Sequence, residues 1–378
     1  MKLKIAFVCI YSKGACGVWT RVSQMSEALA KKGFEVHVFS TNKVKGTEGV
    51  AKDYEVYNNV SIHRFQSFLS IGRNINLWFF YKKLKKINPD IIIAEVYRHP
   101  HTLFALKAAK KLKKPVFLVT HAPFVEKEMR GKIGNTVQKI YDTFVGKKIL
   151  ESFDEIITIT KWEVPFLRRL GIRKKLNYIP NGIPEEFFKT RIKFKNPRKI
   201  LYFGRISPIK NLETLIHTIS LIENKNIKVE IIGPPEKEYV QKLKILMQEK
   251  KLQNMIKISP PIFDLKKKIK EIDNFDIFVL PSKREAMPQA LMELMALGKI
   301  VIASNTKGAK EIILDKKNGF LFKIGNEEDL KNNILFCLNK ENFPKIKEIQ
   351  VNARKSVEQY SLNKLVLKLE KLIKKHLK

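Results

Sequence analysis

Short apolar runs alternate with longer segments of helical periodicity along the whole chain. The first run, Lys4 to Ile10, precedes an amphipathic stretch from Val18 to Lys32, and similar pairs follow as far as Ile179. Short apolar runs indicate buried strands, and apolar residues with a helical repeat indicate covering helices. Strands that alternate with helices in this way predict a parallel sheet with helices on its faces. We therefore expect a Rossmann-like α/β domain in the first half of the chain.

The alternation stops once and then begins again. The segment from Pro184 to Arg198 is polar and contains proline, and a new strand pattern starts at Lys199. Polar, proline-bearing segments are typical of domain boundaries. The pattern predicts two Rossmann-like domains that face each other across a cleft, over residues 1–183 and 199–355, with a linker over 184–198. The last segment, 356–378, is expected to be a helix that buries one face.

One stretch of the second half predicts a phosphate site. Residues 278–304 read FVLPSKREAMPQALMELMALGKIVIAS, which indicates a strand, a polar loop, a helix that starts at Pro288 and a second strand after Gly298. Proline at the start and glycine after the end are common limits of a helix. In a parallel sheet the ligand crevice lies at the carboxyl ends of the strands, and a helix N-terminus there suits a phosphate group.

Two carboxylates accompany this helix. Glu285 lies just before its start, and Glu293 lies inside it among apolar residues. Because carboxylates repel phosphate, they must bind something else, and sugar hydroxyl groups are the obvious candidates. Two glutamates that merely face solvent are the alternative, which the apolar context of Glu293 makes less favourable. The stretch therefore indicates a site for phosphate together with sugar hydroxyls.

A loop at the start of the second domain carries two cations. Gly204 to Asn211 reads GRISPIKN, with Arg205 and Lys210 between a strand and a helix for which Asn211 is the expected N-cap. Two cations beside a helix N-terminus form a natural diphosphate clamp. They could equally be solvated charges, but their position in the same sheet as the Pro288 helix favours the clamp.

Two features of the first domain lie at the same predicted sheet edge. A glycine-containing loop with Gly17 follows the first strand, and His121 follows the strand that ends at Thr120. Glycine lets backbone approach a ligand closely, but the loop matches neither the dinucleotide fingerprint nor the P-loop. An isolated histidine is often structural, so the position of His121 at a strand end is what favours a functional role.

The composition is strongly basic. Lys and Arg number 73 against 37 Asp and Glu, a formal net charge of +36. Such a field attracts polyanions. The candidate partners are therefore nucleic acid, an anionic lipid surface and a nucleotide diphosphate. A lysine-rich compositional bias is the alternative explanation of the charge. No nucleic-acid-binding motif is present, so no nucleic-acid partner is expected. The segment Asn74 to Ile87 either contacts a membrane as an amphipathic helix or packs on the sheet through Trp78, Phe79 and Leu84.

Cysteine content and hydropathy indicate the compartment. The 3 cysteines are scattered without disulfide or zinc spacing, which favours a reducing compartment. No apolar run approaches the length of a membrane span, and the N-terminal run reads as a strand rather than a secretory signal. We expect a cytoplasmic protein that can attach peripherally at the inner face of the membrane.

Four motifs resemble those of a known family when taken in order. They are EAMPQALMELMALGKIVIAS from Glu285, FGRISPIKN from Phe203, IPNGIPEEFF from Ile179 and KGAKEIILDKKNGFLF from Lys307. Together they resemble retaining glycosyltransferases of the GT-B fold, in the large family 4 group related to sucrose synthase and mannosyltransferases. The spacing of Glu285 and Glu293 is similar to the E-x7-E motif of that family. The resemblance covers nearly the whole chain and implies that the final helix crosses back to the N-terminal domain.

The resemblance implies a role for each candidate residue. Arg205 and Lys210 would bind the diphosphate of a nucleotide-sugar donor, Glu293 the ribose hydroxyls and Glu285 the hydroxyls of the transferred sugar. The remaining contacts would come from Gly17 to the diphosphate, His121 to the sugar, and backbone N–H groups of Ala286, Met287, Gln289 and Ala290. The implied reaction is hexosyl transfer to an acceptor hydroxyl with retention, in the synthesis of cell-surface glycans or glycolipids. A lipid-linked acceptor is a hypothesis.

No metal or other cofactor is expected, because fixed cations can stabilise the leaving diphosphate and no Asp-x-Asp motif is present. The chain has Glu-Ala-Met-Pro at 285–288 where the family often has Glu-Gly-Phe-Gly, and Cys16-Gly17 where it commonly has a Gly-Gly pair. These departures concern the identity of the donor sugar more than the reaction class. The alternatives are a basic nucleic-acid-binding protein, a catalytically inactive nucleotide-binding α/β protein, and an inverting GT-B enzyme.

Overall fold

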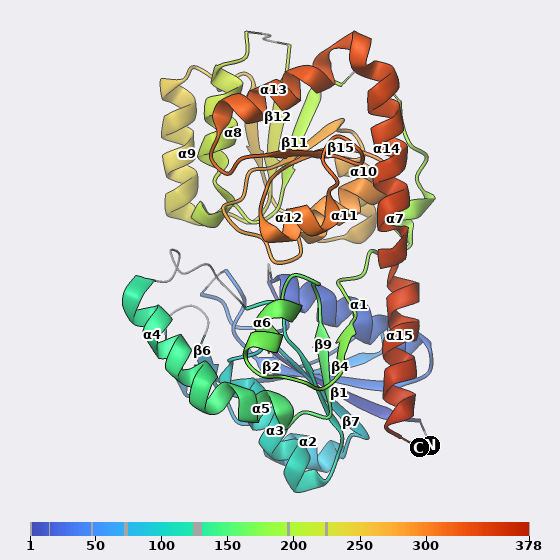
Figure 1. Ribbon diagram of the computed structural model, residues 1–378. Helices are drawn as coiled ribbons and strands as arrows, with labels where there is room; N and C mark the ends of the chain where they lie inside the picture. Colours follow the sequence, from blue (N-terminus) through green and yellow to red (C-terminus); the bar gives the residue numbers. More distant parts are fainter. Residues whose placement is uncertain are drawn as a thin grey trace. The chain divides into compact units, whose positions relative to one another are not determined.

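The chain forms two compact units. The computed structural model describes residues 2–14, 16–46, 48–71, 75–123, 131–194, 197–223 and 226–377 (Figure 1). Unit 1 comprises Met1–Gly182 together with Leu362–Lys378, and unit 2 comprises Ile183–Ser361. The chain therefore leaves unit 1 once, completes unit 2, and returns for its last helix.

Unit 1 is built on an eight-stranded sheet with the order β10-β9-β8-β7-β1-β2-β4-β3. Every neighbouring pair is parallel except β3 with β4. The strands are β1 (Lys4–Tyr11), β2 (Glu35–Thr41), β3 (Tyr54–Tyr57), β4 (Val60–Phe65), β7 (Ile91–Glu95), β8 (Val116–Val119), β9 (Glu155–Thr158) and β10 (Leu176–Tyr178), and a separate hairpin pairs β5 (Leu69–Ile71) with β6 (Ile75–Leu77). The central strands are buried along almost their whole length, which is why they read as continuous apolar runs.

Helices cover both faces of this sheet. They are α1 (Gly17–Lys31), α2 (Tyr81–Ile87), α3 (Pro100–Leu112), α4 (Gly131–Tyr141), the π-helical segment η2 (Asp142–Gly146), α5 (Lys147–Glu151), α6 (Val164–Arg169) and α15 (Leu362–Lys375). The C-terminal helix α15 runs beside α1 (Figure 1), and Lys32 forms an ion pair with Glu370 at 2.9 Å. Its far end is fixed by Glu155, which accepts hydrogen bonds from Lys375 and His376. The predicted return of the final helix to the first domain is thus present.

Unit 2 contains a fully parallel six-stranded sheet with the order β13-β12-β11-β14-β15-β16. Its strands are β11 (Lys199–Phe203), β12 (Lys228–Ile232), β13 (Ile256–Ser259), β14 (Ile277–Leu280), β15 (Ile300–Ser304) and β16 (Phe320–Phe322). Its helices are α7 (Glu186–Lys189), η3 (Pro208–Lys210), α8 (Leu212–Ser220), α9 (Lys237–Glu249), α10 (Leu265–Ile272), α11 (Gln289–Ala296), α12 (Lys307–Ile312), α13 (Glu327–Leu338), η4 (Lys340–Asn342), α14 (Phe343–Val357) and η5 (Glu358–Tyr360). Both units are therefore Rossmann-like, as the alternating pattern predicts.

Three local expectations need correction. The segment 184–198, expected to be a linker, contains α7 and belongs to unit 2, because Phe187 is completely buried there. The sheet of unit 1, expected to be parallel, has an antiparallel edge strand, β3, between Thr41 and Asn59. Proline 288 occupies the N-cap of α11 rather than its first turn, and helix limits commonly differ by one residue between assignments.

The aromatic segment before α2 packs mainly inward. Trp78 and Leu84 are fully buried, which confirms the expectation that they pack on the sheet. Phe79 does not, because it is 73% exposed and stacks on Phe68 with ring centroids 4.6 Å apart. Asn74, where the expected helix begins, lies outside the described residues.

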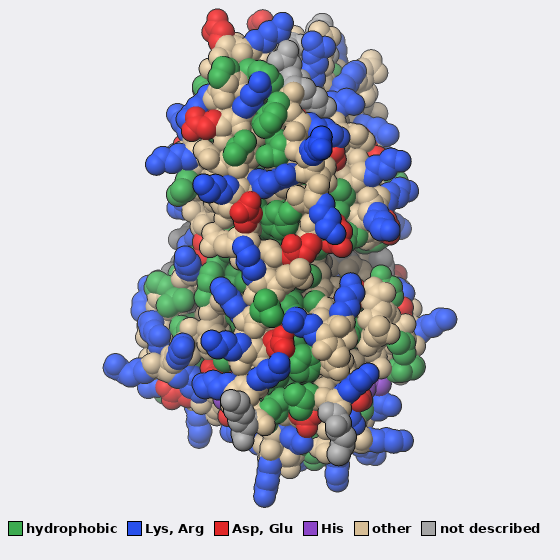
Figure 2. Space-filling view, turned by 90° about the vertical axis from the view of Figure 1, so that its right-hand side faces the viewer, with side chains coloured by type: hydrophobic (Ala, Val, Ile, Leu, Met, Phe, Trp, Pro, Cys, Tyr) green, Lys and Arg blue, Asp and Glu red, His purple; other side chains and the backbone are tan. Residues whose placement is uncertain are grey.

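The surface is basic over both units. Figure 2 shows Lys and Arg side chains distributed across one face of the molecule, with no single dense cluster. Within the described part of the chain, no helix has the length and apolar character needed to cross a membrane.

Candidate functional site

The predicted residues of unit 2 meet at the carboxyl edge of its sheet. Strands β11 and β14 are neighbours, and the loops that follow them carry Lys210 and Glu285 respectively. Lys210 Nζ lies 2.5 Å from Glu285 Oε1, and both side chains are mostly buried. The hydroxyl of Ser282 donates to the same oxygen at 2.6 Å. Two residues far apart in sequence are therefore fixed against each other by parallel neighbouring strands.

Backbone contacts hold the Glu285 loop in place. The N–H of Lys283 donates to the carbonyl of Ile209 at 2.9 Å, which ties this loop to the one that carries Lys210. The N–H of Gly308 donates to the carbonyl of Glu285 at 3.2 Å. A Cβ at position 308 would lie 2.5 Å from the carbonyl oxygen of Ala286, so only glycine allows α12 to approach so closely.

Arg205 lies in the same loop as Lys210 but pairs with a different carboxylate. Its Nη1 atom lies 3.4 Å from Glu236 Oε1, and its side chain is more exposed than that of Lys210. The hydroxyl of Tyr202 donates to the carbonyl of Arg205 at 2.7 Å. Burial raises the pKa of Tyr202, so this hydroxyl remains a donor at neutral pH. The structure thus fixes the backbone of the predicted clamp and gives its two cations separate acidic partners.

Helix α11 begins directly after the Glu285 loop. Met287 is buried, while Gln289 and Ala290 form the first positions of the helix and are partly exposed. The first N–H groups of a helix have no intrahelical acceptor, so this end favours an anion. Asn211 stands at the N-cap of α8 as predicted, although its side chain donates to Thr214 Oγ1 at 2.7 Å instead of capping the helix.

Glu293 is the buried carboxylate of α11, with only 1% of its side chain exposed. Its Oε2 atom forms an ion pair with the ammonium of Lys268, and its Oε1 atom accepts from Gln289 Nε2 at 3.3 Å. The Lys268 ammonium also lies 5.0 Å from the ring centroid of Phe203 and 5.4 Å from that of Phe187. Sequence reasoning missed Lys268, because it stands in a run of lysines in which nothing distinguishes the one that turns inward.

Unit 1 presents a second group of buried charges at its own sheet edge. His121 Nε2 lies 2.5 Å from Glu95 Oε2, and Glu95 is the last residue of β7. Arg21 Nε lies 3.9 Å from the same oxygen, and Arg21 Nη1 donates to the carbonyl of Pro180 at 2.8 Å. Burial lowers the pKa of Arg21, and the Glu95 carboxylate opposes that shift. Sequence reasoning missed Glu95 and Arg21, although an acidic residue directly after the apolar run IIIA was a readable signal.

Backbone strain concentrates around this histidine. Val96, Arg98, His121 and Ala122 all have positive φ values, of 79°, 69°, 58° and 46°. Positive φ is uncommon for residues other than glycine, and such strain persists where surrounding contacts enforce it, often at functional sites. The buried carboxylate of Glu163 supplies one such contact, because its Oε2 accepts from the N–H of Ala122 at 3.0 Å. The four residues follow the neighbouring strands β7 and β8.

Gly17 opens α1. A Cβ placed there would meet no atom within 4 Å, so packing within the chain does not require glycine at this position. The absence of a side chain leaves the backbone of the β1–α1 loop open to approach by a ligand.

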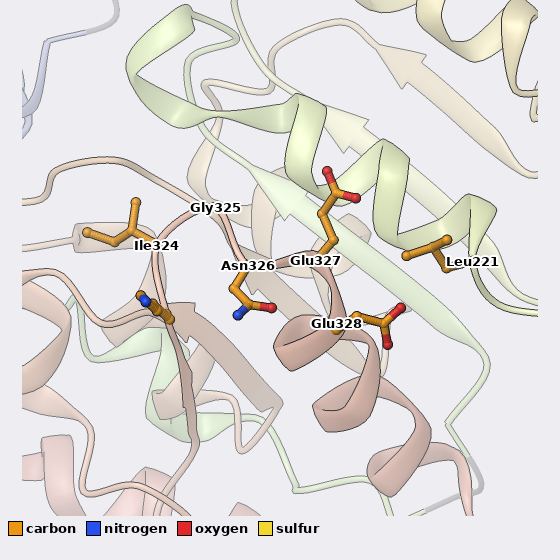
Figure 3. A pocket seen from close by; sticks show the side chains of 7 residues that line it. Leu221, Ile324, Gly325, Asn326, Glu327 and Glu328 are labelled. Carbon is orange, nitrogen blue, oxygen red and sulfur yellow. The ribbon is translucent and has the colours of Figure 1, made fainter.

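The described residues contain no group of three His, Cys, Asp or Glu side chains suited to a metal ion. A shallow hollow of about 510 Å³ lies elsewhere in unit 2, beside the start of α13 (Figure 3). It is lined by Leu221, Lys323, Ile324, Gly325, Asn326, Glu327 and Glu328. None of the predicted site residues lines it, and the carboxylates of Glu327 and Glu328 at this helix start disfavour an anion.

Two models of known protein families match the chain. Residues 15–187 match the family model described as Glycosyltransferase Family 4, and residues 183–356 match the model described as Glycosyl transferases group 1. The chain belongs to the group 1 glycosyltransferases. The two matches together span nearly all of both units of the enzyme.

Relatives and solved structures agree with this assignment. The glycosyltransferase is 27% identical to an uncharacterized glycosyltransferase of Methanocaldococcus jannaschii, over 94% of this chain and 96% of that protein. It is 24% identical, over 76% of each chain, to the N,N'-diacetylbacillosaminyl-diphospho-undecaprenol alpha-1,3-N-acetylgalactosaminyltransferase of Campylobacter jejuni. Its fold is similar to that of the Anabaena protein HepE in complex with UDP-glucose, with a TM-score of 0.75, 19% identity, and coverage of 99% and 100% of the two chains. The GT-B fold implied by the sequence motifs is confirmed.

Proposed function

We propose that this glycosyltransferase moves a hexose from a nucleoside-diphosphate sugar to an acceptor hydroxyl with retention of anomeric configuration. The observation that carries the proposal is the contact between Lys210 and Glu285 beside the start of α11. This contact brings a cation, a carboxylate and a helix N-terminus together at one edge of one sheet, a combination that suits a diphosphate and sugar hydroxyls.

Charge development explains why these groups are needed. When the bond from the anomeric carbon to the diphosphate breaks, the electron pair leaves with the diphosphate and the sugar becomes positively charged. Lys210, Arg205 and the N–H groups at the start of α11 would stabilise the leaving group, and such fixed donors act without reorganisation. The acceptor oxygen would attack on the face that the diphosphate leaves and pass its proton to the departing diphosphate, which gives retention. Fixed cations supply the charge that a metal ion supplies in other enzymes, and we propose no metal cofactor.

Glu285 and Glu293 would each bind a different part of the donor. Oε1 of Glu285 is engaged by Lys210 and Ser282, and we propose that its Oε2 accepts a hydroxyl of the transferred sugar. We assign the ribose to Glu293, contacts with the transferred sugar to the backbone N–H groups of Ala286 and Met287, and contacts with phosphate to those of Gln289 and Ala290.

We propose that His121 and Gly17 of unit 1 also contact the donor, at the sugar and the diphosphate respectively. The short contact of His121 Nε2 with Glu95 supports the first role, because the carboxylate fixes the orientation of the ring at this sheet edge. The open space at Gly17 supports the second.

We also propose that the acceptor is lipid-linked and that unit 1 attaches to an anionic membrane surface at the inner face of the membrane. The name of the Campylobacter jejuni relative includes a diphospho-undecaprenol acceptor. The exposed face of α4, η2 and α5 combines apolar and basic side chains suited to anionic lipid. This α4–α5 face is defined by Ile140, Phe144 and Val145 with Lys139, Lys147 and Lys148. Cys9 and Cys337 are buried as thiols, which fits a reducing, cytoplasmic compartment.

The proposal is tested by incubating the purified enzyme with UDP- and GDP-sugars and measuring release of the nucleoside diphosphate and thermal stabilisation. At least one donor is expected to be hydrolysed slowly and to raise the melting temperature. The product with a hydroxyl acceptor, analysed by NMR at the anomeric carbon, is expected to keep the donor configuration. An inverted product would overturn the retaining mechanism, and no turnover or stabilisation with any nucleotide-sugar would overturn the function.

A further inference from the structure

Lys268 occupies an unusual position for a lysine of α10. Its neighbours Lys266, Lys267 and Lys270 are exposed, whereas only 15% of the Lys268 side chain is exposed. It turns inward to the carboxylate of Glu293 and lies over the ring of Phe203, the last residue of β11. Since β11 leads directly into the loop of Arg205 and Lys210, the ammonium lies at the sheet edge that carries the other candidate site residues.

The burial of this pair needs an explanation beyond stability. Removing two charges from water is costly, and a buried ion pair often stabilises a fold less than apolar residues of similar volume. The two partners differ in exposure, because Glu293 is 1% exposed whereas Lys268 retains some exposure. A ligand that reaches this carboxylate from solvent is therefore expected to meet the ammonium as well.

An adjacent ammonium and carboxylate match a particular ligand chemistry. An ammonium has three N–H donors, and a carboxylate offers acceptor positions on both oxygens. A hydroxyl group both donates and accepts, so a vicinal diol can donate to the carboxylate and accept from the ammonium simultaneously. A ribonucleotide sugar such as a UDP- or GDP-sugar carries such a diol on its ribose, and a 2′-deoxyribonucleotide lacks it.

We propose that Lys268 binds the ribose diol together with Glu293, and that this pair restricts the donor to ribonucleotides. The inference rests on the proposed function, in which Glu293 is the ribose-binding carboxylate. It adds a second residue to that contact and excludes deoxythymidine diphosphate sugars as efficient donors.

The test compares binding of UDP with binding of 2′-deoxy-UDP and 3′-deoxy-UDP by calorimetry, and repeats it with GDP and its deoxy analogues. The wild-type enzyme is expected to bind the ribonucleotide roughly ten- to a hundredfold more tightly than at least one deoxy analogue, as expected for a hydrogen bond to a charged group. Lys268→Met is expected to weaken ribonucleotide binding and reduce that preference by roughly tenfold, and Lys268→Arg is expected to retain most of it. Lys266→Met, an exposed lysine of the same helix, serves as the matched control and is expected to bind like wild type.

A second variant guards against misfolding. Lys268→Met leaves the buried Glu293 carboxylate without a cation, which can destabilise the unit. The double variant Lys268→Met/Glu293→Gln removes both charges, keeps an amide at position 293, and is expected to lose the preference as well.

The outcomes separate the two proposals. If ribonucleotides bind but wild type does not distinguish the deoxy analogues, or if folded Lys268→Met or the double variant keeps the full preference, the role of Lys268 is overturned while the proposed function stands. Tighter ribonucleotide binding by Lys268→Met would show that the lysine blocks the carboxylate, which also overturns it. If no nucleoside diphosphate binds the wild-type enzyme, the proposed function itself fails.

Discussion

The Nζ atom of Lys210 lies 2.5 Å from Oε1 of Glu285, although the two residues are 75 positions apart in the chain. Neighbouring parallel strands, β11 and β14, deliver them to the same edge of the sheet. The contact fixes the lysine ammonium beside the start of α11 before any ligand arrives, so a diphosphate would meet a cation whose position is already set.

Replacement of Gly17 by alanine separates ligand approach from folding. A Cβ at this position meets no atom within 4 Å, and alanine is favoured over glycine in a helix by roughly 0.5–1 kcal/mol. We therefore expect Gly17→Ala to melt at the wild-type temperature or slightly above, while the sugar-transfer rate falls roughly tenfold or more because the methyl group obstructs the donor. Thermal melting and the transfer rate check the two parts. An unchanged rate would show that the Gly17 backbone does not contact the donor.

The Glu95 carboxylate is expected to be important for the stability of unit 1. Glu95→Gln keeps the shape of the side chain but removes the nearer of the two carboxylates, Glu95 and Glu163, that act on the buried guanidinium of Arg21. Breaking a buried pair in this way costs about 3–5 kcal/mol, so chemical denaturation should show a clear loss of stability. The surface variant Glu48→Gln provides the control. If Glu95→Gln had the same free energy of unfolding as the wild type, Glu95 and Arg21 would not interact as charges.

Much of the architecture was readable from the sequence because buried parallel strands and their covering helices have different apolar periods. The strand Lys4–Tyr11 and the helix Gly17–Lys31 fall within one residue of where the pattern places them. The short antiparallel strand β3 was not readable, because three of its four residues are exposed at the sheet edge and lack a buried run.

The candidate site was only partly readable for a different reason. Glu285 and Lys210 stand in loops between clear strands and helices, so their position predicts their meeting. Lys268 and Arg21 lie within helices that carry several other basic or polar residues. Their inward orientation depends on packing against distant elements, which sequence periodicity does not record. The roles of His121, Gly17 and Glu293 toward a donor remain predictions.

Unit 1 is expected to lose stability in mild acid. Burial lowers the pKa of His63 and His99 to about 4 and that of His101 to about 3. The pKa of a histidine in the unfolded chain is about 6.5. Between these values the unfolded chain binds more protons than the folded one. The contribution of these neutral histidines to the stability of unit 1 is therefore fully present above about pH 6.5. It is lost as the pH falls towards the pKa values of the folded state.

The loss of stability in acid can be measured, and we expect it mainly in unit 1. The fully enclosed His101 alone contributes about 1.4 kcal/mol per pH unit below 6.5. Of the 7 histidines, unit 2 contains a single one, His217. Calorimetry between pH 7.5 and 5 is expected to move the transition of unit 1 to lower temperature more than that of unit 2. The variant His101→Gln should show a smaller change of the unit 1 melting temperature with pH. An unchanged pH dependence would contradict the role of His101 in the acid sensitivity.

Membrane attachment is expected to depend on the α4–α5 face. Phe144 is 77% exposed between basic residues, so Phe144→Ser should weaken co-sedimentation with vesicles that contain anionic phosphatidylglycerol. Leu314→Ser changes a 63% exposed apolar residue of unit 2 and should have no effect. Equal binding by both variants and wild type would place the contact elsewhere, and no wild-type binding would argue against peripheral attachment.

The central claim is that Lys210 and Glu285 act together on a nucleoside-diphosphate sugar. Its most direct test is the rate of sugar transfer by Lys210→Ala and Glu285→Ala, with Lys283→Ala, an exposed lysine of the same loop as Glu285, as the matched control. Each of the two site variants is expected to lose roughly a hundredfold or more in rate, because a single fixed electrostatic contact contributes about 2.7–4 kcal/mol in other enzymes. All three variants are expected to melt within a few degrees of wild type. Full transfer activity in both folded site variants would contradict the assignment.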